Sequence, residues 1–311
     1  MTSQYCFGID VGGTTVKMGL FSIEGELLDN WEIVTRIENE GVHIVPDIAA
    51  SILAKVAEKS ISREEIVGVG IGVPGPVDDD GIVYKTANTG WGVFNLKKEL
   101  QDLLNMNVKT GNDANVAALG EMWKGGAQGY HNVVLVTLGT GVGGGIIING
   151  KILTGATGAG GEIGHMHIQD GELEKCGCGN YGCLEQYASA TGVVRLANKK
   201  LETCDKPSVL RKGEVSAKAI FDAVKSGDAL AAEILEEFGE YLGKGLALVG
   251  GVCNPEVFVL GGGVSKAGTM LIDYVQKYYK KYVFNGSSEA KFTLATLGNS
   301  AGIYGAAKMV L

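Results

Sequence analysis

The sequence has little positive charge. Its 27 lysine and arginine residues are outnumbered by 35 aspartate and glutamate residues, which gives a formal net charge of −8. A surface that binds nucleic-acid phosphates needs clustered basic side chains, and an acidic average works against such a surface. We therefore expect no nucleic-acid partner.

The N-terminal residues also lack the pattern expected of a targeting leader. The first residues, MTSQYCFGID, contain no basic segment followed by an apolar run, so the sequence predicts a cytoplasmic protein without a secretory signal. One uncharged stretch, residues 132–150, is long enough to cross a bilayer. Its middle, GTGVGGG, disfavours a helix, and its ends are rich in β-branched residues. We expect two strands joined by a glycine loop there, and no membrane partner.

Two common nucleotide-binding motifs are absent or incomplete. No G-x-x-x-x-G-K-[ST] string occurs, which excludes a P-loop. Two G-x-G-x-x-G strings begin at Gly70 and Gly139, but the dinucleotide fingerprint needs a helix directly after its glycines. The first string runs into PGPVDDDG and the second into the β-rich run GGGIIIN. A nicotinamide cofactor is therefore disfavoured.

Glycine is abundant, with 49 residues in a chain of 311, about twice its usual share. The length exceeds that of a single core and predicts two lobes. Buried runs such as YCFGIDV and EIVGVGIGV alternate with helical patterns such as IVPDIAASILAKVAEKS and DANVAALGEMWK, which indicates an α/β fold. A glycine turn follows a buried run at DVGGTT, TLGTGVGGG and VLGGGVS. This recurrence predicts two related α/β lobes that face one cleft.

The stretch DVGGTTVK has the residue types of a phosphate loop. Asp10 ends a buried run, Gly12 and Gly13 allow a tight turn with bare backbone amides, and Thr14 and Thr15 add hydroxyl groups. Asp10 could hold a metal directly or through water. An ordinary hairpin turn capped by the aspartate explains the same residues. The similar stretch LGTGVGGG favours a nucleotide clamped between two hairpins.

The cysteine-rich stretch CGCGNYGCLE follows GGEIGHMHI, which holds two of the four histidines. Cytosolic cysteines stay reduced, which argues against a disulfide, and the Cys-x-x-Cys spacing of a redox dithiol is absent. Three thiolates and one imidazole suit zinc in a closed tetrahedral site. Spacing alone allows Cys176, Cys178 and Cys183 to be joined by either His165 or His167.

These motifs, together with GVPGPV, GNDANVAALGE, GEIGH and LGGGVS, resemble the ROK family of repressors and sugar kinases. The similarity runs from Phe7 to the C-terminal GNSAGIYGAA and is greatest to the bacterial glucokinases of that family. It implies an actin-like, ribonuclease H-like ATPase fold with two lobes around an interlobe cleft. The implied lobes are a small one, 1–113 plus 300–311, and a large one, 114–299, with the metal-binding loop. A homodimer is also common in such kinases.

The resemblance implies that Mg-ATP phosphorylates the 6-hydroxyl of glucose. Asp113 is the implied general base, and Asn112 the implied ligand of a neighbouring hydroxyl. On residue type alone Asp113 is also a good helix N-cap, and a carboxylate at a helix start stays ionised in either role. The implied nucleotide-binding residues are Asp10, Gly12, Gly13, Thr14, Thr15, Gly139, Thr140, Gly141, Gly143, Gly262 and Gly263.

The family pattern also favours His165 as the fourth metal ligand, with Cys176, Cys178 and Cys183. It implies that Glu162, His165 and Glu185 contact the sugar. With no open coordination position, the zinc is expected to be structural and to shape the sugar pocket. Its loss should therefore impair sugar binding and spare ATP binding.

Two other functions of the family stay open. One is a kinase for another hexose, such as N-acetylmannosamine, fructose or mannose, since shared carboxylates bind shared hydroxyls. The other is a sugar-sensing repressor, which carries a helix-turn-helix domain ahead of the first phosphate loop. Here the first strand is expected near Tyr5, which leaves no room for such a domain, so a repressor is disfavoured.

Overall fold

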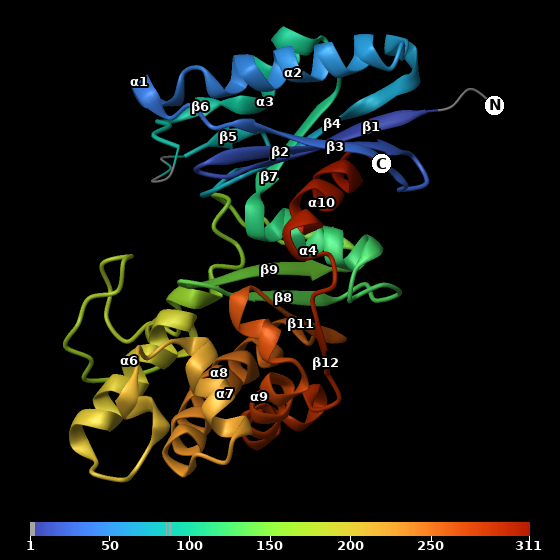
Figure 1. Ribbon diagram of the computed structural model, residues 1–311. Coiled ribbons are helices and arrows are strands. Elements are labelled where there is room, and N and C mark those ends of the chain that lie inside the picture. Colours follow the sequence, from blue (N-terminus) through green and yellow to red (C-terminus); the bar gives the residue numbers. More distant parts are fainter. Residues whose placement is uncertain (1–3, 85, 87–88) are drawn as a thin grey trace. The chain divides into compact units, whose positions relative to one another are not determined.

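The computed structural model describes residues 4–84, 86 and 89–311 (Figure 1). By its internal contacts the chain forms two compact units. Unit 1 comprises Met1–His131, Gly145–Gly161 and Thr296–Leu311, and unit 2 comprises Asn132–Gly144 and Glu162–Ala295. This division differs from the expected lobes, because residues 114–131 and 145–161 group with the first part of the chain.

Unit 1 is built on a five-stranded sheet in the order β3-β2-β1-β4-β7. Its strands are β1 (Tyr5–Val11), β2 (Thr15–Ser22), β3 (Leu27–Val34), β4 (Ile66–Val73) and β7 (Val108–Asn112). The first three are antiparallel neighbours, and β4 runs parallel to both β1 and β7. The predictions of strands at the buried runs YCFGIDV and EIVGVGIGV are confirmed by β1 and β4.

Helices cover both faces of this sheet. They are α2 (Ile44–Glu58) and α3 (Leu96–Leu104) on one face and α10 (Ala301–Met309) on the other. Phe7 and Ile9 of β1 belong to the apolar cluster with α2 and α3, whereas Cys6 packs with Ile303 and Ala307 of α10. This division follows from the alternation of side chains along a strand. Shorter elements of the unit are α1 (Glu38–Gly41), β5 (Ile82–Val83), β6 (Phe94–Asn95) and β10 (Lys151–Ile152).

Helix α4 (Asp113–Lys124) packs backbone to backbone on α10. A Cβ on Gly120 of α4 would lie 2.2 Å from the carbonyl oxygen of Ala301, and one on Gly305 of α10 would lie 1.7 Å from that of Val116. Any larger side chain at either glycine would push the helices apart. This close contact explains why the chain beyond residue 113 stays in unit 1.

Unit 2 combines a parallel sheet with a group of helices. Strands β8 (Val133–Leu138), β11 (Val257–Gly261) and β12 (Lys291–Leu294) are adjacent in that order. The helices are α5 (Glu185–Ala188), α6 (Ala190–Thr203), α7 (Ala217–Lys225), α8 (Ala229–Cys253) and α9 (Thr269–Tyr282). Every residue of β11 is buried, as is usual for a parallel strand covered on both faces.

The uncharged stretch 132–150 forms β8 and β9 (Val142–Ile148), joined by the glycine loop, as predicted. The boundary between the two units passes through β9. Within the described part of the chain, none of the helices has both the length and the apolar character needed to cross a membrane.

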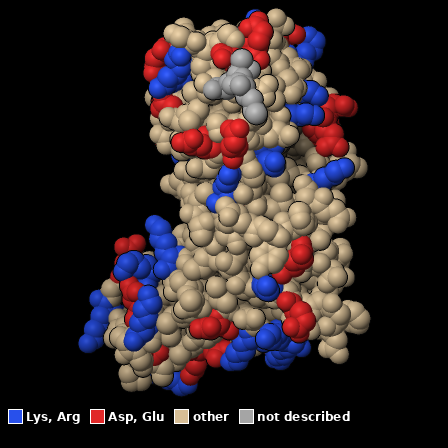
Figure 2. All heavy atoms as spheres, turned by 90° about the vertical axis from the view of Figure 1, so that its right-hand side faces the viewer, with Lys and Arg blue, Asp and Glu red and all other residues tan. Residues whose placement is uncertain are grey.

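Ion pairs join two of the helices of unit 2. Lys277 and Lys281 of α9 contact Glu236 and Glu240 of α8 at 2.7 and 2.9 Å. On the face of the molecule drawn in Figure 2, basic and acidic side chains lie interspersed.

Candidate active site and metal centre

The first glycine loop is the turn between β1 and β2 in unit 1. The backbone N–H of Gly12 donates to the carbonyl oxygen of Thr15 at 3.0 Å, and the buried hydroxyl of Thr35 donates to the carbonyl of Gly12 at 2.7 Å. Gly13 and Thr14 are exposed at the tip. Thr15 of β2 and Thr35, which directly follows β3, thus hold this turn, which leaves backbone and hydroxyl groups open to a ligand.

Asp10 lies at the end of β1, next to this turn. A Cβ on Gly302 would lie 2.5 Å from Cγ of Asp10, so the carboxyl group packs against the first turn of α10. Burial raises the pKa of Asp10, and the positive charge of Lys17 opposes that effect. A bound cation would likewise favour the ionised form, so Asp10 fits a role as a metal ligand.

Helix α4 begins at Asp113, as predicted, but the aspartate does not cap it. The cap is Asn112, whose Oδ1 accepts from the backbone N–H of Asn115 at 3.1 Å, while its Nδ2 donates to the carbonyl of Gly75 at 3.1 Å. The Asp113 carboxylate accepts from the N–H of Ala114 at 2.8 Å. The alternative interpretation of Asp113 as the N-cap is therefore wrong, because the preceding asparagine takes that position.

The second glycine loop, here taken as residues 139–143, joins β8 to β9 and includes the first two residues of β9. Within it, the N–H of Gly139 donates to the carbonyl of Gly141 at 3.0 Å. The first two residues of α6 also contact this loop. The N–H of Ala190 donates to the carbonyl of Gly139 at 2.8 Å, and the hydroxyl of Thr191 donates to the carbonyl of Thr140 at 2.6 Å. This loop is therefore held by a segment distant in sequence.

Glu185 lies between this loop and the cysteine-rich stretch. Its Oε2 accepts from the N–H of Val142 at 3.4 Å and lies 2.4 Å from where a Cβ on Gly141 would be. Its Oε1 accepts from the thiol of Cys176 at 2.9 Å and lies 3.6 Å from Nδ1 of His165. A cavity of about 440 Å³, lined among others by Thr140, Glu185 and Cys176, opens beside these groups. The structure thus brings together His165 and Glu185, as predicted, whereas Glu162 is exposed.

The third glycine loop follows β11. Gly262 has a φ of +80°, and a Cβ on it would lie 2.5 Å from the carbonyl oxygen of Leu138 at the end of β8. Only glycine suits such a conformation and approach. Gly263 then begins a short 3₁₀ turn, Gly263–Ala267. The chain therefore presents bare backbone at the ends of the neighbouring strands β8 and β11.

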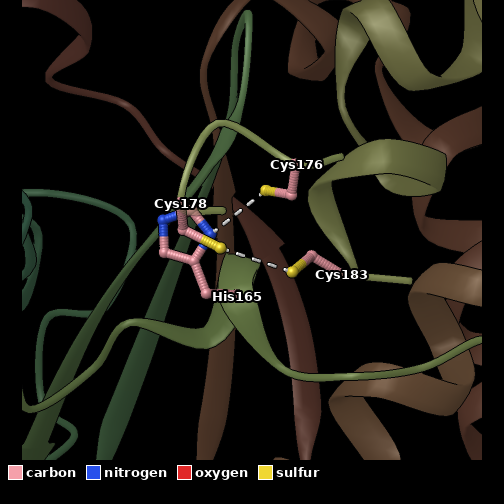
Figure 3. Close-up of side chains that lie close together, drawn as sticks. All are labelled: His165, Cys176, Cys178 and Cys183. Atoms are coloured by element: carbon pink, nitrogen blue, oxygen red, sulfur yellow. Dashed lines mark hydrogen bonds between the residues drawn. The ribbon is translucent and has the colours of Figure 1, made fainter. Parts of the chain in front are cut away.

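His165, Cys176, Cys178 and Cys183 form one cluster whose four ligand atoms lie within 4.8 Å of one another. Their side chains point toward a common centre (Figure 3), with Cys176 Sγ 3.6 Å from His165 Nδ1 and Cys178 Sγ 3.7 Å from Cys183 Sγ. Ligands on a tetrahedron around zinc are about 3.3–3.8 Å apart. The donor set and its spacing therefore fit a tetrahedral metal site.

Several alternatives for these residues are settled by geometry. All six cysteines are free thiols, so the cysteine-rich stretch is not a disulfide knot. His167 is outside the cluster, because Nδ1 contacts the carbonyl of Tyr181 at 2.9 Å and Nε2 contacts Asp170 at 2.8 Å. The hydrogen bond with Asp170 raises the pKa of His167. His165 is the histidine of the cluster, as the family pattern predicted.

The thiols differ in their environment. Burial raises the pKa of Cys176 and of Cys183, whereas a hydrogen bond from the backbone N–H of Asn180 lowers that of Cys178. Metal binding requires all three thiols to be deprotonated. Cys178 is therefore the thiol whose deprotonation is favoured most.

Comparison with known proteins agrees with these features. The model of the ROK family matches residues 6–311. The chain belongs to the ROK family. It is 41% identical to a glucokinase of Halalkalibacterium halodurans over 100% of this chain and 96% of that protein. The xylose repressor of Bacillus subtilis is 31% identical, over 99% of this chain and 77% of the repressor.

Among solved structures, a ROK family glucokinase from Streptomyces griseus, in complex with glucose and AMPPNP, superposes with a TM-score of 0.73. It is 34% identical, with 98% of each chain covered. This ROK protein accordingly has the actin-like ATPase fold that its motifs implied.

Sequence reasoning missed the residues that hold the second loop. Ser189 caps α6 by accepting from the N–H of Gly192, and a serine before a helical run is a recognisable signal for a helix start. Nothing in the spacing indicates that Ala190 and Thr191 then reach Gly139 and Thr140. Those contacts join segments about 50 residues apart and depend on tertiary packing.

Proposed function

We propose that this ROK protein is an ATP-dependent glucokinase, which transfers the γ-phosphoryl group of ATP to the 6-hydroxyl of glucose. The observation that carries the proposal is the 41% identity to a glucokinase over the full chain. The exposed glycine loops and the carboxylate at the start of α4 support it, because they supply the two parts that phosphoryl transfer needs.

In the proposed reaction, Asp113 accepts the proton of the 6-hydroxyl as that oxygen forms a bond to the γ-phosphorus. The bond between the γ-phosphorus and the oxygen of the leaving ADP breaks. The transition state is loose, so positioning dominates and a weakly basic carboxylate suffices. Asp10 is the proposed ligand of Mg²⁺, which when bound with ATP would neutralise phosphate charge.

Binding is divided among the predicted residues. The loops at Gly12 and Gly141 are proposed to surround the phosphates, and Gly262–Gly263 to border the adenosine. Asn112, Glu162, His165 and Glu185 are proposed to bind sugar hydroxyls. Asn112 already caps α4 through Oδ1, but an amide has two acceptor sites and two donors, so it retains capacity for a sugar.

The proposed metal is zinc, held by His165 and the three cysteines. With four protein ligands no position stays open, so the zinc supplies structure and not an activated water. It would hold the stretch between His165 and Glu185 in one conformation. A cytoplasmic location, predicted from the N-terminal sequence, and a homodimer, predicted from the family resemblance, both remain predictions.

Purified protein tests the proposal when it is mixed with Mg-ATP and a panel of sugars. We expect glucose to give the highest kcat/KM, with ADP and glucose 6-phosphate formed in equal amounts. N-acetylgalactosamine belongs in the panel beside N-acetylmannosamine, fructose and mannose, because a relative at 31% identity is an N-acetylgalactosamine kinase. If the protein clearly preferred another sugar, that sugar would replace glucose as the proposed substrate, and the proposed class of reaction would stay the same.

A further inference from the structure

The contacts of the second glycine loop suggest a role for the metal cluster beyond the sugar pocket. This inference rests on the proposed function. Cys183, the last ligand, is followed by Glu185, Ala190 and Thr191, all three of which hydrogen-bond to the loop 139–143. The same short segment thus completes the metal cluster and holds the loop.

The segment is well suited to transmit a change in the cluster. Its start is fixed by the N–H of Leu184, which donates to the carbonyl of Met166 at 2.9 Å, next to the ligand His165. Tyr187 and Ser189 farther along are buried, and Ser189 caps α6. The short helix α5 and the first turn of α6 occupy most of the chain between Cys183 and Thr191, so this interval contains little irregular backbone.

We propose that the metal cluster positions the loop 139–143, and with it the nucleotide, through this segment. Thr191 acts as a positioning residue. Thr191 is exposed and outside the core, yet its hydroxyl donates to the carbonyl of Thr140 at 2.6 Å. Loss of the metal therefore weakens nucleotide binding as well as sugar binding. This differs from the expectation that ATP binding is spared, because that expectation placed the cluster beside the sugar alone.

Two variants separate the cluster from the link. Cys178→Ser removes a metal ligand, and Thr191→Val removes the hydroxyl while the four ligands stay. Thr203→Val is the matched control, because the Thr203 hydroxyl also donates to a backbone carbonyl, that of Lys199 at 2.8 Å, at the far end of α6. Thr191→Ser keeps the hydroxyl and should behave as wild type.

The experiment measures the affinity of each protein for Mg-AMPPNP and, separately, for glucose by calorimetry, with zinc content by elemental analysis. For Thr191→Val we expect about fivefold weaker AMPPNP binding, the equivalent of one hydrogen bond, with zinc and glucose affinity retained. For Cys178→Ser we expect zinc loss and AMPPNP binding weakened roughly tenfold or more, because all three contacts loosen.

Wild-type AMPPNP affinity in Thr191→Val, or in folded, zinc-free Cys178→Ser, would overturn the inference and leave the glucokinase proposal intact. A wild-type protein that binds neither AMPPNP nor glucose would overturn both. If Thr191→Val fails to fold, nucleotide affinity in wild-type protein stripped of zinc by a chelator decides the matter by the same criterion.

Discussion

The turn between β1 and β2 and the loop 139–143 both follow a buried strand and both offer glycine backbone to a ligand. They differ in what holds them. The first is held by Thr15 of its own antiparallel sheet and by Thr35, the residue after β3. The second depends on Glu185, Ala190 and Thr191, which follow the metal cluster in the chain. Similar loops can therefore be independent of a distant site or linked to it.

The largest expected effect is a loss of turnover on substitution of Asp113, which belongs to neither loop. Asp113→Asn keeps the shape of the side chain but cannot take up the proton of the sugar hydroxyl. We expect kcat to fall by at least about a hundredfold, with the affinities for glucose and Mg-AMPPNP nearly unchanged. Steady-state kinetics and calorimetry check this, with Asp205→Asn as a control at an exposed position. Near wild-type turnover would remove Asp113 from the proposed mechanism.

A comparison of two glycines sharpens the contrast within the second loop. A Cβ on Gly141 would collide with Glu185 Oε2 at 2.4 Å, whereas a Cβ on Gly139 meets nothing within 4 Å. We expect Gly141→Ala to weaken both Mg-AMPPNP and glucose binding roughly tenfold, because Glu185 must move. Gly139→Ala should affect the nucleotide alone. Equal glucose affinities in the two variants would contradict the link through Glu185.

Thr35→Val tests the independence of the first loop. The substitution removes the hydroxyl that donates to the carbonyl of Gly12 at 2.7 Å, so that carbonyl loses this hydrogen bond. We expect a loss of about 1–3 kcal/mol in the free energy of unfolding, and Mg-AMPPNP affinity reduced a few-fold. The reduction should be the same factor in zinc-loaded and zinc-free protein. A factor that depends on zinc would show that the first loop is linked to the cluster too.

The smallest effect concerns the stretch that leads into the cluster. Burial alone would raise the pKa of Glu172, but hydrogen bonds from Arg195 and Tyr187 outweigh it and lower the pKa to about 2. A carboxyl group whose pKa is lowered in the folded protein stabilises the fold at pH values above its ordinary pKa, which is near 4. This stabilisation is lost as the pH falls toward 2. Glu172→Gln should therefore cost about 1–2 kcal/mol at pH 7 and progressively less below pH 4. Urea unfolding across this range checks the trend, and a pH-independent difference would contradict it.

Much of the fold was predictable, because it follows from local patterns. Buried β-branched runs predicted β1, β4, β8 and β11, and the helical pattern after Asn112 predicted α4 with its start at Asp113. The members of the metal cluster were predictable for a similar reason, since they lie close in sequence and zinc accepts few residue types.

What escaped prediction depends on contacts between distant segments. The place of α4 in unit 1 follows from Gly120 and Gly305, whose backbone approach has no local signature. The choice of His165 over His167 did not escape prediction, but it needed the family pattern, because spacing alone cannot show that both nitrogens of His167 have other partners. The contact between Thr191 and the second loop likewise has no signal in spacing or composition.

The roles proposed for the loops, for Asp113 and for the cysteine-rich stretch all depend on the phosphorylation of glucose by ATP. The most direct measurement is phosphorus magnetic resonance of purified protein incubated with Mg-ATP and glucose, which identifies the product and its position of attachment. We expect glucose 6-phosphate and ADP in equal amounts, formed with a kcat in the ordinary enzyme range of about 1–10³ s⁻¹. Binding of glucose without any transfer of the γ-phosphoryl group, in zinc-loaded wild-type protein, would contradict it.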